Sequence, residues 1–320
     1  LSERVNKLSA IFLSKVSEKL VMKRGFAINA PGTNFVKINS DYACNEINDK
    51  YEYENQIYSI EPVLEVLETQ QHPRCLFINT RDGKKLKYLL KGSEDLRLDE
   101  RLMLLFALIN GMLCNIDSTK ENEVFIARYA VIPLTKTVGL IKWVTGADTM
   151  HQMIVENRKM FGISKEIESE VITSFTNTNF IQMNSLQRLE VFEEVLTKTK
   201  GQELFEAMWL KSPSAAVWMT RTQKFTLSSS LMSMVGYIIG LGDRHPSNIM
   251  VQRETGNIVH IDFCESFEKT LFRKQFPEKV PFRLTRMIIN AFEGSIENGL
   301  FQEFANEIMK VLRENKETLI

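Results

Sequence analysis

One short stretch of the chain gathers most of its chemically active side chains. Residues 242–248 read Gly-Asp-Arg-His-Pro-Ser-Asn, and residues 260–263 read His-Ile-Asp-Phe. From residue 249 to 263 the chain alternates as two strands around a polar turn, which predicts a β-hairpin. Because a hairpin returns its second strand beside its first, we expect Asp262 to lie close to Asn248.

These residue types are the ones that a phosphoryl-transfer site requires. Transfer of a γ-phosphoryl group depends mainly on positioning and charge stabilisation. Asp243 can orient or deprotonate the attacking hydroxyl, while Asn248 and Asp262 can offer oxygen ligands to Mg²⁺. The alternative treats each residue as an ordinary turn or capping residue, which fits any one of them alone but not the set at this spacing.

His245 precedes Pro246, which favours an extended backbone and an exposed ring. One role for the imidazole is donation to the γ-phosphate as negative charge shifts in the transition state. Another is to share proton transfer with Asp243. A third interpretation is a loop histidine that bonds to a backbone carbonyl, and the sequence leaves all three open.

The unit resembles the catalytic and metal-binding loops of the phosphatidylinositol 3-kinase-related kinase family, in which the loop reads Asp-Arg-His instead of His-Arg-Asp. Further segments resemble the target-of-rapamycin (TOR) branch of that family, namely residues 31–33, 89–92, 94–97, 99–101, 128–134, 209–214, 234–237 and 276–286. The similarity runs from about Val16 to the last residue. It implies an α+β, two-lobed, protein-kinase-like catalytic domain that uses ATP with Mg²⁺ or Mn²⁺.

The hydrophobic pattern agrees with two lobes. Strands are expected at residues 35–38, 57–60, 75–79, 85–90 and 125–132, and helices at residues 4–22, 99–115, 148–161, 164–174, 185–197, 200–209, 226–240 and 301–318. By resemblance, residues 1–24 end a rapamycin-binding helical insert, residues 25–142 form a strand-rich N-lobe, and residues 143–320 form a helical C-lobe whose C-terminal end is missing. An amphipathic helix that packs on the following lobe fits residues 4–22 equally well.

Lys91 ends the apolar strand Tyr-Leu-Leu, so its stem is held while its ammonium can meet phosphate oxygens. Glu94 or Asp99 should orient it, as a carboxylate does for the nucleotide-binding lysine of protein kinases. The sequence does not choose between the two acids.

The resemblance implies the rest of the nucleotide site. Thr69, in a loop at residues 68–74, would help to cover the phosphates, and Trp143 would lie over the adenine while the Val144 backbone bonds to its edge. The other expected contacts are Leu89, Tyr129 and Ile141 around the nucleotide, with Met250 and Ile261 beneath the base. Each of the apolar residues is also a plausible core residue. Lys142 departs from the animal TOR pattern, which has Gly there, and this puts drug binding in doubt more than ATP binding.

Cys264 is a second departure, because the family's metal-binding tripeptide ends in Gly. Glycine accepts a positive φ at little cost, whereas Cys would lose roughly 1–2 kcal/mol there. Either the loop keeps φ negative at Cys264, or activation is impaired. With Asp243, Asn248, Asp262 and Lys91 all present, an active kinase is the favoured interpretation.

Composition excludes several classes of function. Forty basic and forty acidic side chains give no net charge, so neither a nucleic-acid surface nor a polybasic membrane anchor is expected. The four cysteines (Cys44, Cys75, Cys114 and Cys264) show no metal-binding spacing, which suits a reducing compartment. No transmembrane segment is expected. By resemblance we expect protein substrates, β-propeller and helical-repeat companion subunits, and a cytoplasmic protein of growth and nutrient signalling that can reach internal membranes through partners.

Three substrate hypotheses remain from sequence: a serine/threonine protein kinase, a phosphoinositide lipid kinase, and a nucleotide-binding scaffold without turnover. A lipid enzyme needs a dense basic cluster after Cys264 to bind its anionic headgroup. Between Cys264 and Phe282 the chain has four basic residues, offset by Glu265, Glu268 and Glu278. That excess of one positive charge favours the protein kinase.

Overall fold

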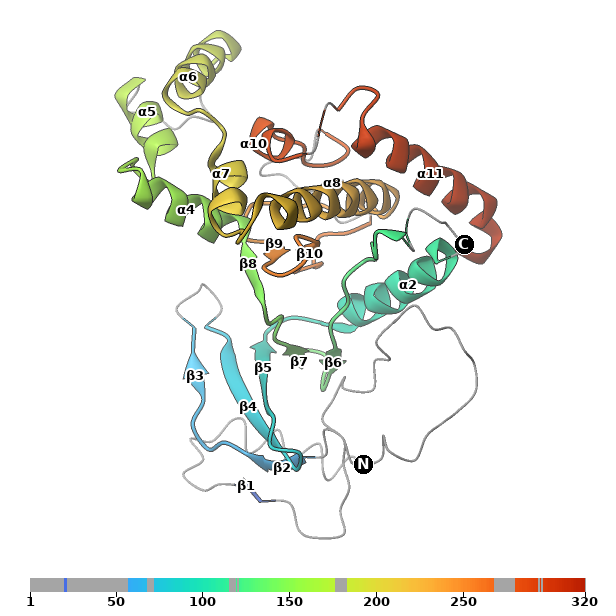
Figure 1. Ribbon diagram of the computed structural model, residues 1–320. Coiled ribbons are helices and arrows are strands. Elements are labelled where there is room, and N and C mark those ends of the chain that lie inside the picture. The colour runs from blue at the N-terminus through green and yellow to red at the C-terminus, as the bar shows by residue number, and fades with distance from the viewer. Residues whose placement is uncertain are drawn as a thin grey trace. The chain divides into compact units, whose positions relative to one another are not determined.

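The computed structural model describes residues 20–21, 57–67, 72–114, 119, 121–175, 183–267, 280–292, 294 and 296–319. The chain separates into two compact units (Figure 1). The first comprises residues 1–111 and 128–145, and the second comprises residues 112–127 and 146–320.

The first unit is built on an antiparallel sheet. Its strand order is β1-β2-β4-β5-β7-β6, and β3 pairs with β4 outside this path. The strands are β1 (Leu20–Val21), β2 (Ile57–Ile60), β3 (Glu65–Val66), β4 (Arg74–Thr80), β5 (Lys85–Gly92), β6 (Val131–Pro133) and β7 (Val138–Lys142). Short polar turns join neighbouring strands, as between β4 and β5, where Gly83 takes a φ of 82°.

Alternation along these strands separates two faces of the sheet. Tyr88 and Leu90 of β5 lie in a hydrophobic core cluster with Leu140 of β7. The intervening residues Leu89 and Lys91 therefore point to the opposite face. This alternation decides which side chains of β5 are available to a ligand.

Helix α2 (Arg97–Leu113) follows β5. Its buried residues include Leu102, Phe106, Ile109 and Leu113, which recur at helical intervals. Acidic residues in its first turn suit the positive end of the helix dipole.

The second unit has a three-stranded antiparallel sheet of order β10-β9-β8 and a set of helices. The strands are β8 (Ala147–Thr149), β9 (Ile249–Gln252) and β10 (Ile258–His260). The helices are α4 (Met150–Met160), α5 (Ile167–Phe175), α6 (Ser185–Lys198), α7 (Glu203–Leu210), α8 (Ala215–Ile238), α10 (Arg286–Asn290), α11 (Leu300–Glu314) and α12 (Lys316–Leu319). The predicted hairpin at residues 249–263 is confirmed as β9 and β10, although the second strand ends at His260.

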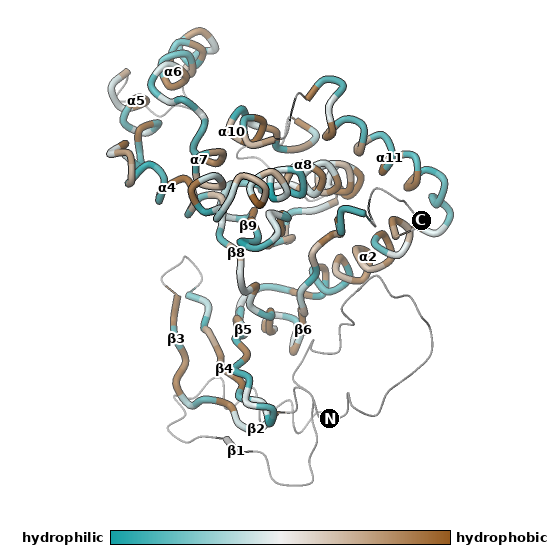
Figure 2. Tube along the Cα trace, in the orientation of Figure 1, coloured by the Kyte–Doolittle hydropathy of each residue, from teal (hydrophilic) through white to brown (hydrophobic). Residues whose placement is uncertain are grey.

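Helix α8 forms the centre of the second unit and contacts α7, α11 and β10 (Figure 1). Phe225, Leu231 and Val235 are almost fully buried, and Ser230 donates from Oγ to the carbonyl of Phe301 at 2.8 Å. Figure 2 shows hydrophobic and hydrophilic residues in turn along α11, whose buried positions recur at helical intervals. Burial of α8 on several sides fixes the loop that leaves its C-terminus.

Three predicted elements differ from the structure. Residues 125–130 carry no strand, so the strand expected at 125–132 begins only at Val131. Helix α8 begins at Ala215, well before the predicted residue 226: Ser214 caps it through a hydrogen bond from the Val217 amide, and its buried residues begin only at Thr222. Leu20–Val21 pairs with β2 as a strand where a helix was expected, and the rest of that segment and the strand at 35–38 lie outside the described residues. Within the described chain, no helix combines the length and apolar composition that crossing a bilayer requires.

Candidate active site

The loop at residues 241–248 joins α8 to β9 and carries the predicted catalytic residues. Leu241 is anchored through its amide, which donates to the Gly236 carbonyl at 2.8 Å, and Gly242 donates to the Glu265 carbonyl at 2.9 Å. The amide of Asn248 donates to the His245 carbonyl at 2.9 Å, which closes the loop on itself. The loop is therefore held at both ends and in its middle.

Asp243 and Asn248 lie in direct contact. Asn248 donates from Nδ2 to the backbone oxygen of Asp243 at 3.0 Å and to its carboxylate Oδ2 at 3.3 Å. Because the amide nitrogen points at Asp243, the amide oxygen Oδ1 points elsewhere and can act as an acceptor. The backbone amide of Ile261 donates to the Asn248 carbonyl at 3.0 Å, so the hairpin brings the neighbouring Asp262 to this loop, as the sequence predicts.

Backbone strain is concentrated at the two acidic residues. Asp243 has a φ of 55° and Asp262 a φ of 61°, the left-handed region that most residues avoid. Such conformations cluster at functional sites, where surrounding structure enforces them. Cys264 is not among the described residues with positive φ. Of the two alternatives for Cys264, the structure has the loop that keeps φ negative.

His245 is half exposed and lies beside the acid. Its Nδ1 accepts from the amide of Ser247 at 3.2 Å, and its Nε2 lies 3.8 Å from Oδ2 of Asp243. Acceptance at Nδ1 places the proton of a neutral imidazole on Nε2, the nitrogen nearer the carboxylate. The interpretation of His245 as a donor to a backbone carbonyl does not match this hydrogen bond.

Arg244 is a candidate site residue that the sequence does not indicate. It is 8% exposed and donates to the carbonyl of Gly242 at 2.7 Å, to that of Ile261 at 2.8 Å and to that of Asp262. One guanidinium thus ties the catalytic loop to the segment that carries Asp262. The residue stands between two predicted site residues, but its acceptors are backbone carbonyls, which no side-chain pattern reveals.

His260 is the second residue that the sequence reasoning missed. Removal of its imidazole from water lowers its pKa well below the usual range, and the positive charge of Arg244 lowers it further. The imidazole is therefore neutral at physiological pH. It lies at the end of β10, opposite Ile249 of β9.

In the first unit, the predicted nucleotide residues share one face of the sheet. Leu89 of β5 lies directly opposite Ile141 of β7, and Lys91 opposite Gly139, on the face away from the core cluster. Lys91 forms an ion pair with Glu94, and both side chains are largely buried. Asp99, the other candidate partner, is buried in the first turn of α2.

The remaining predicted residues of the nucleotide site lie on several elements of the two units. Trp143 donates its amide to the Lys87 carbonyl at 3.0 Å, and the Lys87 ammonium lies 4.2 Å from the centre of its indole ring. Burial lowers the pKa of Lys142.

The other predicted residues of this unit are Val144, which is partly buried, and Tyr129, which is buried, while Thr69 lies outside the described residues. In the second unit, Met250 is buried on β9 and Ile261 follows β10.

The donor set of the loop and hairpin fits a hard divalent cation. Asn248 offers a neutral amide oxygen and Asp262 a carboxylate, and Mg²⁺ prefers such oxygen ligands, usually one or two from the protein with phosphates and waters completing the shell. Neither sulfur nor imidazole has to take part. The residues present therefore fit a Mg²⁺ ion.

Comparison with known proteins places the chain in a family. The sequence profile described as phosphatidylinositol 3- and 4-kinase matches residues 85–320. The chain belongs to the phosphatidylinositol 3- and 4-kinase family. It is 41% identical over all 320 residues to the serine/threonine-protein kinase TOR of Arabidopsis thaliana, and 46% identical over 256 residues, 80% of the chain, to the serine/threonine-protein kinase tor1 of Schizosaccharomyces pombe. The predicted similarity to the TOR branch is thus confirmed.

The chain spans only 12% of the Arabidopsis relative and 11% of the yeast relative. Among solved structures of this kinase fold, the open conformation of CtTel1 matches 99% of the chain and 12% of its own length, with a TM-score of 0.75 and 23% identity. At that identity the likeness shows the fold alone. The predicted two-lobed, α+β kinase fold is confirmed.

Proposed function

We propose that this chain is the catalytic part of a TOR-type serine/threonine protein kinase, which transfers the γ-phosphoryl group of ATP to protein hydroxyls in growth and nutrient signalling. One observation carries the proposal most directly. The carboxylate of Asp243 is fixed by the amide of Asn248, and Arg244 ties their loop to Asp262. Such a fixed acid beside two hard oxygen donors is what phosphoryl transfer to a hydroxyl requires.

Asp243 orients the attacking hydroxyl through its carboxylate and receives its proton as the hydroxyl oxygen bonds to the γ-phosphorus and the bond from that phosphorus to the β–γ bridging oxygen breaks, with ADP as the leaving group. Asn248 and Asp262 hold the divalent cation, Mg²⁺ or Mn²⁺, which when bound neutralises charge on the phosphates. His245 donates from Nε2 towards developing negative charge, because its Nδ1 is already an acceptor. Lys91, oriented by Glu94, binds phosphate oxygens as a point charge.

By the family resemblance, Leu89 and Ile141 would hold the nucleotide from the face that they share, Trp143 would lie over the adenine, and the Val144 backbone would bond to its edge. The resemblance also assigns nucleotide contacts to Tyr129 of the first unit, and to Met250 and Ile261 of the second. Asp99 supports Lys91 from the start of α2. Thr69, outside the described residues, helps to cover the phosphates.

A protein substrate is favoured over a lipid. The matched relatives named above are serine/threonine-protein kinases, and the segment after Cys264 lacks the basic excess that a multiply phosphorylated headgroup needs. A scaffold without turnover is disfavoured because Cys264, its main support, sits in the loop without a left-handed φ.

Companion subunits and a cytoplasmic location are part of the same proposal. Helix α6 exposes Leu186, Leu189 and Phe192, which recur every three residues along it. The β-propeller and helical-repeat partners come from the resemblance, and through them the kinase would also reach internal membranes.

The substrate class is tested with the full-length protein from its source. It is incubated with labelled ATP, Mg²⁺ or Mn²⁺, a serine/threonine peptide mixture and phosphoinositide vesicles, beside the matched variant Asp243→Asn. Label in peptide that is lost in the variant supports the proposal. Label only in lipid establishes a lipid kinase, and nucleotide binding without any label establishes a scaffold.

A further inference from the structure

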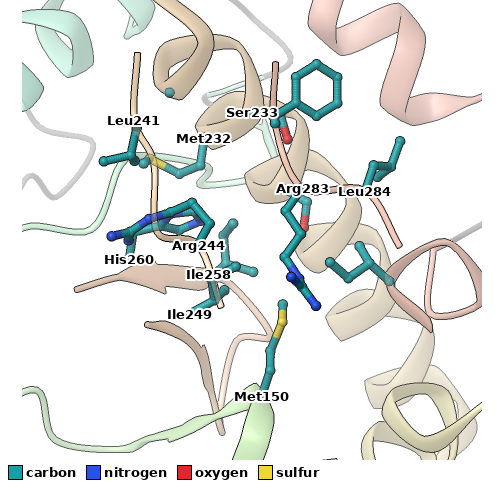
Figure 3. A pocket seen from close by; sticks show the side chains of 14 residues that line it. Met150, Met232, Ser233, Leu241, Arg244, Ile249, Ile258, His260, Arg283 and Leu284 are labelled. Atoms are coloured by element: carbon teal, nitrogen blue, oxygen red, sulfur yellow. The ribbon is translucent and has the colours of Figure 1, made fainter. Parts of the chain in front are cut away.

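Behind the catalytic loop, the second unit encloses a small cavity of about 30 Å³ (Figure 3). Its wall comes from the start of α4, from α8, β9 and β10, from the loop itself, and from α10 with the segment before it. Its polar wall residues are Ser229, Ser233, Arg244, His260 and Arg283, and Met232, Ile249 and Ile258 supply apolar wall. Figure 3 shows His260 and Arg244 on the same side of the cavity.

Two polar atoms of this wall are buried without a hydrogen bond to any part of the chain that the structure describes. They are Nδ1 of His260 and Oγ of Ser229. Ser229 is 6% exposed as a residue. Because a buried donor or acceptor that stays unbonded costs free energy, native proteins satisfy such atoms with protein groups or ordered water.

The cavity has the size and polarity to hold that water. One buried water needs about 10–15 Å³ of such volume and two to four polar partners. A volume of about 30 Å³ therefore admits one or two waters. His260, Ser229 and the guanidinium of Arg244 supply the partners from three different elements.

Arg244 links this cavity to the site. Its Nε donates to Gly242 in the catalytic loop, while its terminal nitrogens donate to Ile261 and Asp262 beyond the hairpin. Any shift of the guanidinium therefore changes the spacing between Asp243 and Asp262. A group that fixes the guanidinium from the cavity side sets that spacing.

We propose that ordered water in this cavity joins His260 to Ser229 and Arg244, and that His260 is thereby a positioning residue for the metal-binding pair Asn248 and Asp262. The proposal rests on the kinase function proposed above. His260 itself touches neither nucleotide nor metal. It acts by holding Arg244, and through Arg244 the backbone of Asp262.

The test compares variants of the full-length protein in the peptide assay at saturating ATP. His260→Phe keeps a ring of similar size and removes both nitrogens, whereas His260→Asn keeps a neutral group that can donate and accept. Ser229→Ala removes the hydroxyl inside α8 and slightly raises helix propensity, so it does not weaken the helix through the backbone. Each variant is characterised by the Mg²⁺ concentration that gives half-maximal activity, the KM for peptide, and the thermal unfolding midpoint.

We expect His260→Phe to raise the half-saturating Mg²⁺ concentration by about tenfold or more, the usual effect of losing a group that orients a metal ligand. The KM for peptide stays at the wild-type value, and Mn²⁺ restores part of the activity. His260→Asn and Ser229→Ala show smaller rises. If His260→Phe and Ser229→Ala both keep the wild-type Mg²⁺ dependence, the proposal is overturned, whatever their stability.

A second measurement does not depend on activity. An experimental structure of the full-length protein at a resolution that shows waters should have solvent density within hydrogen-bonding distance of His260 Nδ1 and Ser229 Oγ. A dry cavity overturns the proposal even if the protein is a kinase. If Asp243→Asn leaves peptide labelling intact, the proposed function fails, but the density still decides whether the hydration site exists.

Discussion

Asn248 donates from its side-chain amide to the carboxylate of Asp243, with 3.3 Å between Nδ2 and Oδ2. This contact joins the residue proposed to accept the substrate proton to a residue proposed to hold the cation. It also sets the direction of the Asn248 amide, whose oxygen is left for the metal. An aspartate at position 248 could not make the same contact, since an ionised carboxylate has no proton to donate.

Asn248→Asp is therefore expected to impair turnover although it keeps an oxygen ligand. Two carboxylates in contact disfavour joint ionisation, so the pKa of the pair rises. We expect kcat to fall by about 10–100-fold and the acidic limb of the pH–rate profile to move to higher pH. Rate profiles of wild type and variant between pH 5 and pH 9 check this. An unmoved acidic limb would contradict the contact's role.

Lys91 and Glu94 are expected to act as one unit. Lys91→Met should reduce kcat/KM for ATP by roughly 30-fold or more, because a hydrogen bond to a charged phosphate is lost. This factor corresponds to about 2 kcal/mol of lost transition-state stabilisation. Glu94→Gln should reduce it less. If Glu94 works through Lys91, the double variant resembles Lys91→Met alone. Additive losses in steady-state kinetics would show that Glu94 acts independently.

Cys264→Gly should leave kcat/KM within about twofold of wild type. Because Cys264 has no positive φ in this loop, glycine relieves no strain there. The added freedom of the unfolded chain should lower the free energy of unfolding by about 0.4–1 kcal/mol. Cys264→Ala is the matched control, and we expect only small changes in its kcat/KM and in its free energy of unfolding. A large loss of activity in both Cys264→Gly and Cys264→Ala would mean that the cysteine side chain has a function, whereas a large loss in Cys264→Gly alone would mean that the loop depends on a restrained backbone there.

Asp148 of β8 should contribute stability that depends on pH. Its hydrogen bonds from Arg253, at 3.0 and 2.6 Å, hold the pKa of the carboxyl below its usual value despite burial, and Lys211 adds to this effect. A lowered folded pKa means that the stabilisation is complete above about pH 4 and is lost as pH falls through the folded pKa.

Asp148→Asn should therefore lower the free energy of unfolding by about 1.5–3 kcal/mol at neutral pH. The difference in the free energy of unfolding between wild type and variant stays constant down to about pH 5 and narrows below about pH 4. Urea unfolding across this range measures it. Glu254→Gln, on the exposed turn beside Arg253, is the control and should change stability by less than about 0.5 kcal/mol. A difference in unfolding free energy that widens in acid would contradict the lowered pKa assigned to Asp148.

The parts of the site that local sequence determines could be predicted. The hairpin follows from alternating residues around a polar turn, and the contact of Asn248 with Asp243 joins residues only five positions apart. The face shared by Leu89, Lys91 and Ile141 follows from strand alternation once β5 and β7 pair. Resemblance to a family added roles to these positions, but their local geometry comes from short-range patterns.

Other parts could not be predicted from the sequence. Arg244 is expected at the surface as a charged loop residue, and only the fold shows that backbone carbonyls 17 and 18 residues later surround it. Arg253 meets Asp148 across 105 residues. The left-handed backbone at Asp243 could not be predicted either, because aspartate occupies that region only when its surroundings enforce it.

Binding of a divalent cation tests the central claim most directly. Mn²⁺ binding to the full-length protein, measured by electron paramagnetic resonance with a non-hydrolysable ATP analogue, is compared among wild type, Asp262→Asn, Asn248→Leu and Asp243→Asn. We predict that the first two variants weaken Mn²⁺ binding by at least about tenfold, and that Asp243→Asn binds as wild type does. Wild-type affinity in both Asp262→Asn and Asn248→Leu would contradict the account.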